Sequence, residues 1–361
     1  MNYNKLIIPV LILCSFMPLK AQKETEIRNF IRSYPVRKNA SLEVVNKYGS
    51  VRLTNWDLDS VSIRAEVIAY APDRSKTEKM FDGVKIDITD YDYTIRARTE
   101  FSQSFGMLVE SFKGMTSKMI SYDSRLEVNY YISLPEYLDI TVENRYGDVY
   151  IEDSKGTVSL TISNGSLKAG TIDKASSLNL SFCDAKIRSI GSGRLDASLS
   201  EITINEIKDL TIKSIGSKFE IEKASSLRTD SRRDKFFIGT VDWLYGNSYF
   251  TDFRIDNLVR KIEITSKYGN ITTEKIEKGF ESVNLVSGYS DISLDFDENA
   301  SYNLDLRHVN AFVSLPDNDE NIEKHSLDSE KKEYLIKGHI GGGSDGATVK
   351  IDATRGNIYL K

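Results

Sequence analysis

Apolar and polar residues alternate along most of this chain, and short polar turns break the alternation at intervals. In residues 158–162 (VSLTI) every second residue is apolar, residues 164–166 (NGS) interrupt the pattern, and Leu167 resumes it. A period of two indicates strands with one buried and one solvated face. Glycine at the turns would tolerate a positive φ, and a neighbouring Asn, Asp or Ser would hydrogen-bond the local backbone.

The turns belong to a repeated motif. Residues 46–51 (NKYGSV) recur as 144–149 (NRYGDV), as 266–271 (SKYGNI) and, more loosely, as 287–292 (SGYSDI). Weaker copies lie between them, at 163–167, 181–185, 198–202, 214–217 and 245–248. A unit of about 18 residues cannot close a core alone, whereas stacked units bury a continuous one. We therefore predict an all-β fold, a parallel β-solenoid (β-helix) over residues 137–361 with a C-terminal cap. A β-sandwich of hairpins is the alternative.

The region before the solenoid differs in detail. Residues 22–136 are predicted to form an N-terminal β cap or first rungs, with strands at 42–45, 51–54, 61–70, 84–89, 93–99 and 126–134. One short helix is expected at 73–81, with Asp73 or Ser75 as its N-cap. The far end is predicted to be covered by a charged stretch at 317–332, a glycine-rich connection at 338–346 and a last strand pair at 349–360. Such covers are expected because open solenoid ends expose unpaired strand edges.

The first 21 residues have the layout of a secretory signal peptide. A short polar start with Lys5 precedes an apolar run at 6–16, and Leu19 and Ala21 occupy the −3 and −1 positions of a cleavage site. The apolar run is about half the length that a membrane span needs. A lipoprotein anchored at Cys14 is the less favoured alternative, because the preceding Leu13 is bulky where a small residue is expected. The sequence thus predicts an extracytoplasmic protein, in the periplasm, on the outer membrane surface or secreted.

Composition changes this picture little. Losing the leader would leave 46 basic and 53 acidic residues, a net charge of −7, without a basic stripe, so nucleic acid is not an expected partner. Cys183 would then be the only cysteine, and it is expected to be a small buried residue.

The motifs carry a resemblance to a known family. Residues 45–51 followed by 55–57 (NWD) and 61–63, together with 341–343 (GGG), 348–351 and 356–358 near the end, resemble the bacterial "putative adhesin" family of β-strand-repeat proteins. The family is a domain of unknown function, so the resemblance implies an extracytoplasmic β-solenoid and transfers no catalytic residue. It covers nearly the whole chain after the leader, and its specificity comes from the order of individually weak motifs.

No catalytic constellation is recognisable. His308, His325 and His339 are scattered without metal-ligand spacing, and the glycine-rich run at 341–346 lacks the ending of a phosphate loop and precedes a strand. Turn acids could share a cation if they stack in one column, but solvated acids are the favoured interpretation; they are Asp148, Asp184, Glu201, Asp234 and Asp291. No cofactor or metal is expected. The prediction is an exported, non-catalytic envelope protein, an adhesin-like or scaffold β-solenoid; a carbohydrate-acting β-helix enzyme is the alternative.

Two surfaces are candidates for binding a protein or glycan partner at the cell envelope. Tyr245, Tyr268 and Tyr289 are predicted to share one column, following Tyr146. An internal aromatic stack is favoured there over an exposed ladder, because intervening copies place Phe182, Leu199 and Ile215 in the column. The other candidate is an inserted apolar loop at 101–122, which could also touch a membrane peripherally; its apolar residues are Phe105, Leu108, Val109, Phe112, Met115 and Met119.

Overall fold

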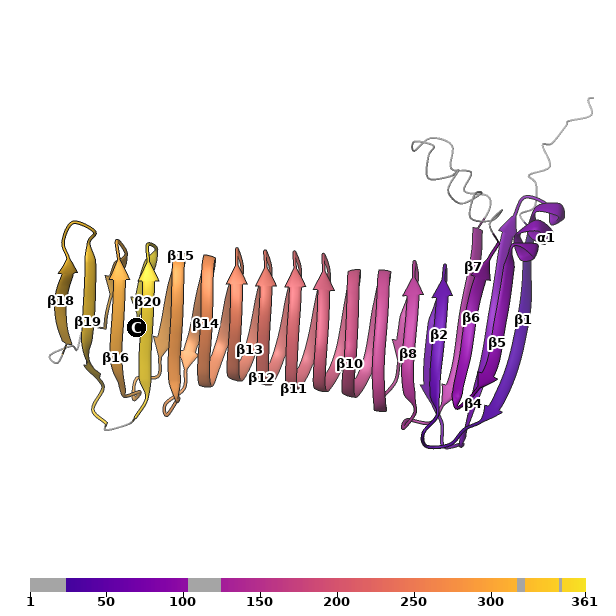
Figure 1. The fold of residues 1–361 in the computed structure, drawn as a ribbon, viewed down its shortest axis with the longest axis horizontal. Coiled ribbons are helices and arrows are strands. Elements are labelled where there is room, and N and C mark those ends of the chain that lie inside the picture. Colours follow the sequence, from indigo (N-terminus) through magenta and orange to yellow (C-terminus); the bar gives the residue numbers. More distant parts are fainter. Residues whose placement is uncertain (1–23, 103–124, 317–321, 344–345) are drawn as a thin grey trace, which may run out of the picture.

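The fold is a long row of strands with a single short helix at one end. The computed structural model describes residues 24–102, 125–316, 322–343 and 346–361. Figure 1 shows the strands side by side along the long axis, with the N-terminal strands and the helix at one end and strands β18 and β19 at the other. All strands of the described part belong to one hydrogen-bonded, open sheet. The predicted all-β class is confirmed.

Central units stack in parallel with a constant offset. Glu201 lies beside Lys218, and Lys218 lies beside Lys235, so the chain returns to the same position every 17 residues. Earlier, Val158 pairs with Ile140, an offset of 18. The strands concerned are β8 (Asp139–Arg145), β9 (Val149–Ile151), β10 (Ser154–Ser198), β11 (Glu201–Ile215), β12 (Lys218–Arg232), β13 (Lys235–Tyr249), β14 (Asp252–Ile276) and β15 (Ser282–Phe296). Hairpins would have produced antiparallel pairs here.

Along the straight segments of each unit every second residue faces inside, and pairs of exposed residues such as Lys208 and Asp209 interrupt the alternation. Strand β11 ends with Leu210 and Ile212 buried between exposed neighbours, and the other units repeat this pattern. Successive inward residues therefore form columns along the row. One column contains Phe219, Phe236 and Phe253, whose rings stack at centroid distances of 4.6 and 5.0 Å.

The glycines at the corners do not have the positive φ that the sequence led us to expect. The glycines of the strong motif, such as Gly49, Gly147 and Gly269, do not have a positive φ; the residue before each of them does, as at Tyr48 (63°) and Tyr268 (56°). Glycine is required for space instead. A Cβ on Gly147 would lie 2.0 Å from the backbone oxygen of Gly49 in the neighbouring unit.

Strands from the N-terminal part of the chain cover the first parallel unit, which begins with β8 and β9. Strands β2 (Ser41–Lys47) and β3 (Val51–Asn55) pair in parallel with β8 and β9, with Asn46 beside Asn144 as the motif predicted. On their other side lie two further strands, β6 (Thr94–Phe101) and β7 (Arg125–Leu134). Three more elements complete this end: β4 (Ser60–Ala71) pairs with β7, β1 (Glu24–Pro35) with β4, and β5 (Val84–Tyr91) with β6.

The predicted helix is present as α1 (Arg74–Asp82). Its N-cap is Asp73, whose carboxylate accepts a hydrogen bond of 2.9 Å from the Lys76 N–H, so one of the two N-cap alternatives is confirmed.

The two ends of the row are built alike: two short strands pair in parallel with the outermost unit, and further strands pair on their other side. Strands β20 (Thr348–Thr354) and β21 (Asn357–Leu360), the last in the chain, lie between β15 and the pair β16 (Tyr302–Val309) and β17 (Phe312–Ser314). Strand β19 (Glu333–Ile340) pairs antiparallel with β16, and β18 (Ile322–Asp328) pairs with β19 as the outermost strand. The predicted last strand pair is thus an inner layer of the row.

Candidate functional site

One corner of every unit carries a residue in the left-handed region, and these residues form a line along the molecule. We call this line the corner ridge; its members are Tyr48, Tyr146, Asn164, Phe182, Leu199, Gly216, Arg233, Phe250, Tyr268, Tyr289, Arg355 and Asn310, with φ between 49° and 64°. Several of them donate their backbone N–H to a carbonyl of the next unit, for example Leu199 to Ile215 and Phe250 to Lys267. These hydrogen bonds hold the corners in one register.

The residue types on the ridge are unusual for this backbone conformation. A left-handed residue other than Gly, Asn or Asp costs roughly 1–2 kcal/mol, yet most ridge positions hold an aromatic, aliphatic or arginine side chain. Most of these side chains also point to solvent: Phe182 is 57% exposed, Leu199 54% and Phe250 48%, whereas Tyr48 and Tyr268 are half-buried. Neither burial in the core nor backbone preference explains why these residue types occupy the corners.

The strongest cluster of rings lies toward the C-terminal end of the ridge. Phe250 stacks on Tyr268 at 4.8 Å, and Tyr268 packs on Tyr289 at 5.2 Å. Tyr249 meets Phe250 edge-on at 4.7 Å. The guanidinium of Arg355 donates to the Tyr289 hydroxyl at 3.0 Å and lies 5.0 Å from its ring centroid. We call Tyr249, Phe250, Tyr268 and Tyr289 the C-terminal aromatic cluster.

A smaller pair occupies the other end of the ridge. Tyr48 and Tyr146 stack at 5.5 Å, and the Lys47 ammonium lies 4.6 Å from the Tyr48 ring centroid. Tyr146 is 42% exposed. Both ends of the ridge thus combine flat rings with a cation, an arrangement suited to a ring-bearing or extended ligand.

The predicted tyrosine column is corrected in two respects. Tyr268 and Tyr289 do share a column, but Tyr245 lies five residues before the ridge position of its unit, which is Phe250, and sits half-buried between the side chains of Arg228 and Lys261. The favoured internal stack is also wrong, because Tyr289 is 45% exposed. Likewise, the ridge residue of the unit at 214–217 is Gly216 and not Ile215.

The turn acids do not form one column either. Asp148, Asp184, Glu201 and Asp291 share a column, and Lys218 and Lys235 interrupt it. Several of its acids hold the next unit: Asp148 accepts from the Ser166 N–H at 3.0 Å, and Asp291 from the Asn357 N–H at 2.8 Å. In the part of the chain that the structure describes, no three His, Cys, Asp or Glu side chains gather as metal ligands.

Asp234, the fifth predicted acid, is buried one position earlier in a polar ladder. Cys183, Ser200, Ser217, Asp234 and Thr251 follow the ridge residue of consecutive units, and each side chain from Ser200 on accepts the backbone N–H of the member before it. Burial raises the pKa of the Asp234 carboxyl, opposed by hydrogen bonds from the Ser217 N–H, the Ser214 hydroxyl and the Arg232 N–H. Cys183 is buried as expected, and burial raises the pKa of its thiol.

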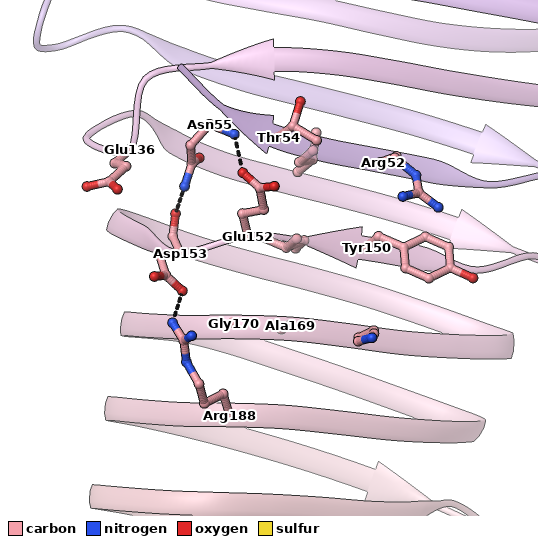
Figure 2. Close-up of a pocket in the computed structure, with 13 residues that line it drawn as sticks. Arg52, Thr54, Asn55, Glu136, Tyr150, Glu152, Asp153, Ala169, Gly170 and Arg188 are labelled. Atoms are coloured by element: carbon pink, nitrogen blue, oxygen red, sulfur yellow. Dashed lines mark hydrogen bonds and ion pairs between the residues drawn. The ribbon is translucent and has the colours of Figure 1, made fainter. Parts of the chain in front are cut away.

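A shallow cleft of about 600 Å³ opens beside two small residues of β10, Ala169 and Gly170, and strands β3 and β9 also line it. Figure 2 shows Asp153 on one wall, held by Arg188 and by the Asn55 amide, which donates to its carbonyl at 2.6 Å. Glu152 accepts the Asn55 backbone N–H at 2.6 Å.

Asp153 does not have the pKa shift that a general acid needs. The Thr171 N–H, followed by Arg188, lowers the pKa of the Asp153 carboxyl, whereas a catalytic acid at neutral pH needs a raised one. Its engaged carboxylate therefore stabilises the corner between units.

Other sequence candidates lie elsewhere. Phe105, Leu108, Phe112, Met115 and Met119 fall outside the described residues, as does the predicted leader. His308 is buried against the Tyr334 ring at 5.3 Å, and burial lowers its pKa. His339 contacts Ser301 and Asn303, and His325 contacts Glu323, so the described histidines are dispersed. Over the described ranges, none of the helical structure is long and apolar enough to cross a membrane.

Comparison with known proteins returns solved structures alone. No family model and no curated protein matches the chain. A "putative cell adhesion protein" from Clostridium sporogenes is 10% identical, with 93% of this chain and 100% of that chain covered and a TM-score of 0.20. A "putative adhesin" from Bacteroides fragilis is 13% identical, with coverages of 75% and 97% and a TM-score of 0.32.

A third match is a "putative lipid binding protein" from Parabacteroides distasonis, 10% identical over 74% of this chain and 96% of that chain, with a TM-score of 0.32. The adhesin names agree with the family that the sequence motifs resemble. Similarity at this level carries no argument about the site, which rests on the chain's own geometry.

Proposed function

We propose that this chain is an exported, non-catalytic binding protein of the cell envelope, adhesin-like in action, whose parallel units wind as a β-solenoid. Its corner ridge binds an extended glycan. The observation that carries the proposal is the presence of exposed aromatic and aliphatic side chains at left-handed positions.

The argument begins with the cost of these residues. Gly or Asn would occupy the corners with less strain, and polar side chains would suit the solvent better. Backbone strain retained at exposed positions is a property of functional sites. The rings of the C-terminal aromatic cluster pack face to face on one another, so they present a row of ring edges along the ridge. Apolar edges suit contact with sugar rings, and Arg355 and Lys267 beside them supply hydrogen-bond donors.

The geometry of the units supports an extended ligand over a compact one. Parallel units place equivalent residues about 4.8 Å apart, so a ridge built from one residue of each unit is a linear array. The enzymatic alternative has less support, because a general acid at neutral pH needs a raised pKa, whereas the pKa of the Asp153 carboxyl in the cleft is lowered.

A triple substitution tests the ridge. We expect Phe250→Ala, Tyr268→Ala and Tyr289→Ala together to weaken binding to the polysaccharides captured on a glycan array about tenfold or more, because each stacked ring contributes roughly 0.5–1.5 kcal/mol.

The matched control removes three exposed rings outside the ridge, by Tyr91→Ala, Phe237→Ala and Tyr359→Ala. Equal loss in both variants, or unchanged binding by the ridge variant, would contradict the proposal. Binding of a protein and of no polysaccharide would replace the glycan by a protein partner. Fractionation of cells, with N-terminal sequencing of the envelope material, tests export: the protein should begin near Gln22.

A further inference from the structure

Among the described residues, the N-terminal end of the row finishes in a strand edge with which no further strand pairs. Strand β1 is the outermost strand at that end in Figure 1, and within the described residues it pairs with β4 alone. The register of β1 runs without a bulge for 12 residues. Such an edge presents a row of free backbone donors and acceptors to another chain.

The structure defines which groups face outward. The Val36 N–H donates to the Asp59 carbonyl at 3.0 Å, which makes the even-numbered residues of this antiparallel pair the ones bonded to β4. The N–H and C=O groups of the odd-numbered residues, including Ile27, Asn29 and Ile31, therefore point to the free side. The Ile31 carbonyl fits this assignment, because it accepts from the neighbouring Arg32 guanidinium and not from β4.

The opposite end of the molecule shows what a protected edge looks like. Strand β18 is short, has a register irregularity between Ser326 and Asp328, and carries Glu323, Lys324 and His325 in succession. Charge, shortness and bulges are the usual protection of an edge strand. Strand β1 is neither short nor bulged, and it exposes apolar side chains: Ile27 is 51% exposed, Ile31 59% and Phe30 38%.

We propose that β1 pairs with β1 of a second copy of this chain, antiparallel and centred on Asn29. This register places Ile27 of each copy opposite Ile31 of the other, and Glu26 opposite Arg32. The Ile pairs fall on hydrogen-bonded positions and the charged pairs on the positions between them, so the sheet continues from one molecule into the other. Cross-strand apolar and opposite-charge pairs each add to such a sheet.

Neighbouring registers are worse for the same residues. Centring the pair on Arg28 would bring the two Arg28 side chains together, and centring it on Phe30 would place Arg28 opposite Arg32. Like charges directly opposite one another destabilise a strand pair. Of these three registers, only the one centred on Asn29 pairs opposite charges without also opposing like charges, and this self-complementarity favours a second copy as the occupant of the edge.

The dimer would join two rows end to end and present two corner ridges. A bivalent protein gains effective affinity for a surface that displays many ligand copies. The inference goes beyond the proposed function and stands or falls independently of it, because dimerisation is measured without any ligand.

A cysteine cross-link tests the register. Asn29→Cys would place two thiols at the two-fold axis, where hydrogen-bonded antiparallel partners have Cα atoms about 5.5 Å apart, within disulfide range. Under mild oxidation we expect a covalent dimer from this variant. Ser33→Cys is the matched control: it faces the same free side, but its two copies would lie far apart in this register, so it should form no covalent dimer.

A charge exchange tests the partner. Sedimentation velocity should show dimers for the unmodified protein and monomers for Glu26→Arg and for Arg32→Glu alone. Mixing the two single variants should restore the dimer, since each mixed pair then joins opposite charges, and so should combining both substitutions in one chain. This outcome cannot arise from a general loss of folding.

The substitution Asn29→Pro is the third test of the dimer. The Asn29 N–H points to the free side, so proline should leave the β1–β4 pair in place and the melting temperature nearly unchanged while it blocks dimerisation. A monomer at every concentration of the unmodified protein would overturn the proposal. A dimer that survives Asn29→Pro and forms no cross-link through Asn29→Cys would overturn it as well, because the interface would then lie elsewhere.

Discussion

The phenylalanine column inside the units allows a quantitative test of how the core is built. Phe219, Phe236 and Phe253 are each 1% exposed or less, and the middle ring stacks on both neighbours. Phe236→Ala removes a fully buried ring and leaves a cavity between two units. Truncations of this kind cost about 3–5 kcal/mol. We expect a value near the upper end, about 4 kcal/mol, because the rings on both sides lose a partner and strand pairing prevents the units from closing the gap.

Phe236→Leu is the control for volume. The neighbouring unit places Ile202 in the same column, so an aliphatic side chain suits the site, and we expect a cost of about 1 kcal/mol. Guanidinium unfolding followed by circular dichroism measures both variants. The circular dichroism spectrum of the unmodified protein should be dominated by β structure, with little helix.

Hydrogen exchange locates the effect. Stacked units contact their nearest neighbours, so protection should fall around residues 218–255 and stay unchanged in β2 and β3. Equal costs for the Ala and Leu variants, or a uniform loss of protection along the chain, would refute the column as a source of local stability.

Three further predictions test corners and caps. Gly147→Ala should destabilise the protein by about 3 kcal/mol, because its Cβ would lie 2.0 Å from the Gly49 oxygen and force two units apart; thermal melting measures it, and an unchanged melting temperature would contradict it. Burial raises the pKa of Asp234, so the native state binds its proton more tightly than the unfolded chain, and this group's contribution to stability falls as pH rises from about 4 toward the raised pKa. Asp234→Thr, which copies Thr251, should remove that part of the slope in melting temperature between acidic and neutral pH; an identical slope would exclude the carboxyl as its source. Asp73→Ala should cost about 1 kcal/mol and increase hydrogen exchange at the start of α1, with no change in the central units.

Local patterns predicted most of the architecture. The motif aligned Asn46 with Asn144 and Ser266 with Ser287, and these pairs are neighbours in the sheet. The helix and its Asp73 cap were also predictable, since capping depends on residues within one turn. The loose copy at 245–248 was misaligned because its Tyr-Gly pair imitates the motif, whereas the spacing of 17 residues from Arg233 leads to Phe250.

Exposure of the corner ridge could not be predicted from alternation. A period of two tells which side chains face inward along a strand, but a left-handed residue breaks the period at each corner. Tyr249 and Phe250 consequently both face solvent although they are adjacent. The ridge can be identified in the sequence only from the spacing of its corner residues. Because these residues are apolar, an inference from residue type alone wrongly predicts that they are buried.

The sequence by itself thus determined most of the strands, their repeat, the all-β class and the single helix, because each depends on interactions within one unit or between units adjacent in the chain. It did not predict β1, β18 or β19, which lie outside the repeat. The tertiary structure decided the order at the two ends. There, β2 and β3 pair with β6 and β7, and β20 and β21 lie between β15 and the pair β16 and β17, pairings that join residues up to 79 positions apart, such as Val51 and Tyr130. Every such strand has the same alternation, so its pattern suits several neighbours equally. Only the competition among all strands for hydrogen-bonding partners selects one, and among the described strands it leaves one edge of β1 without a partner.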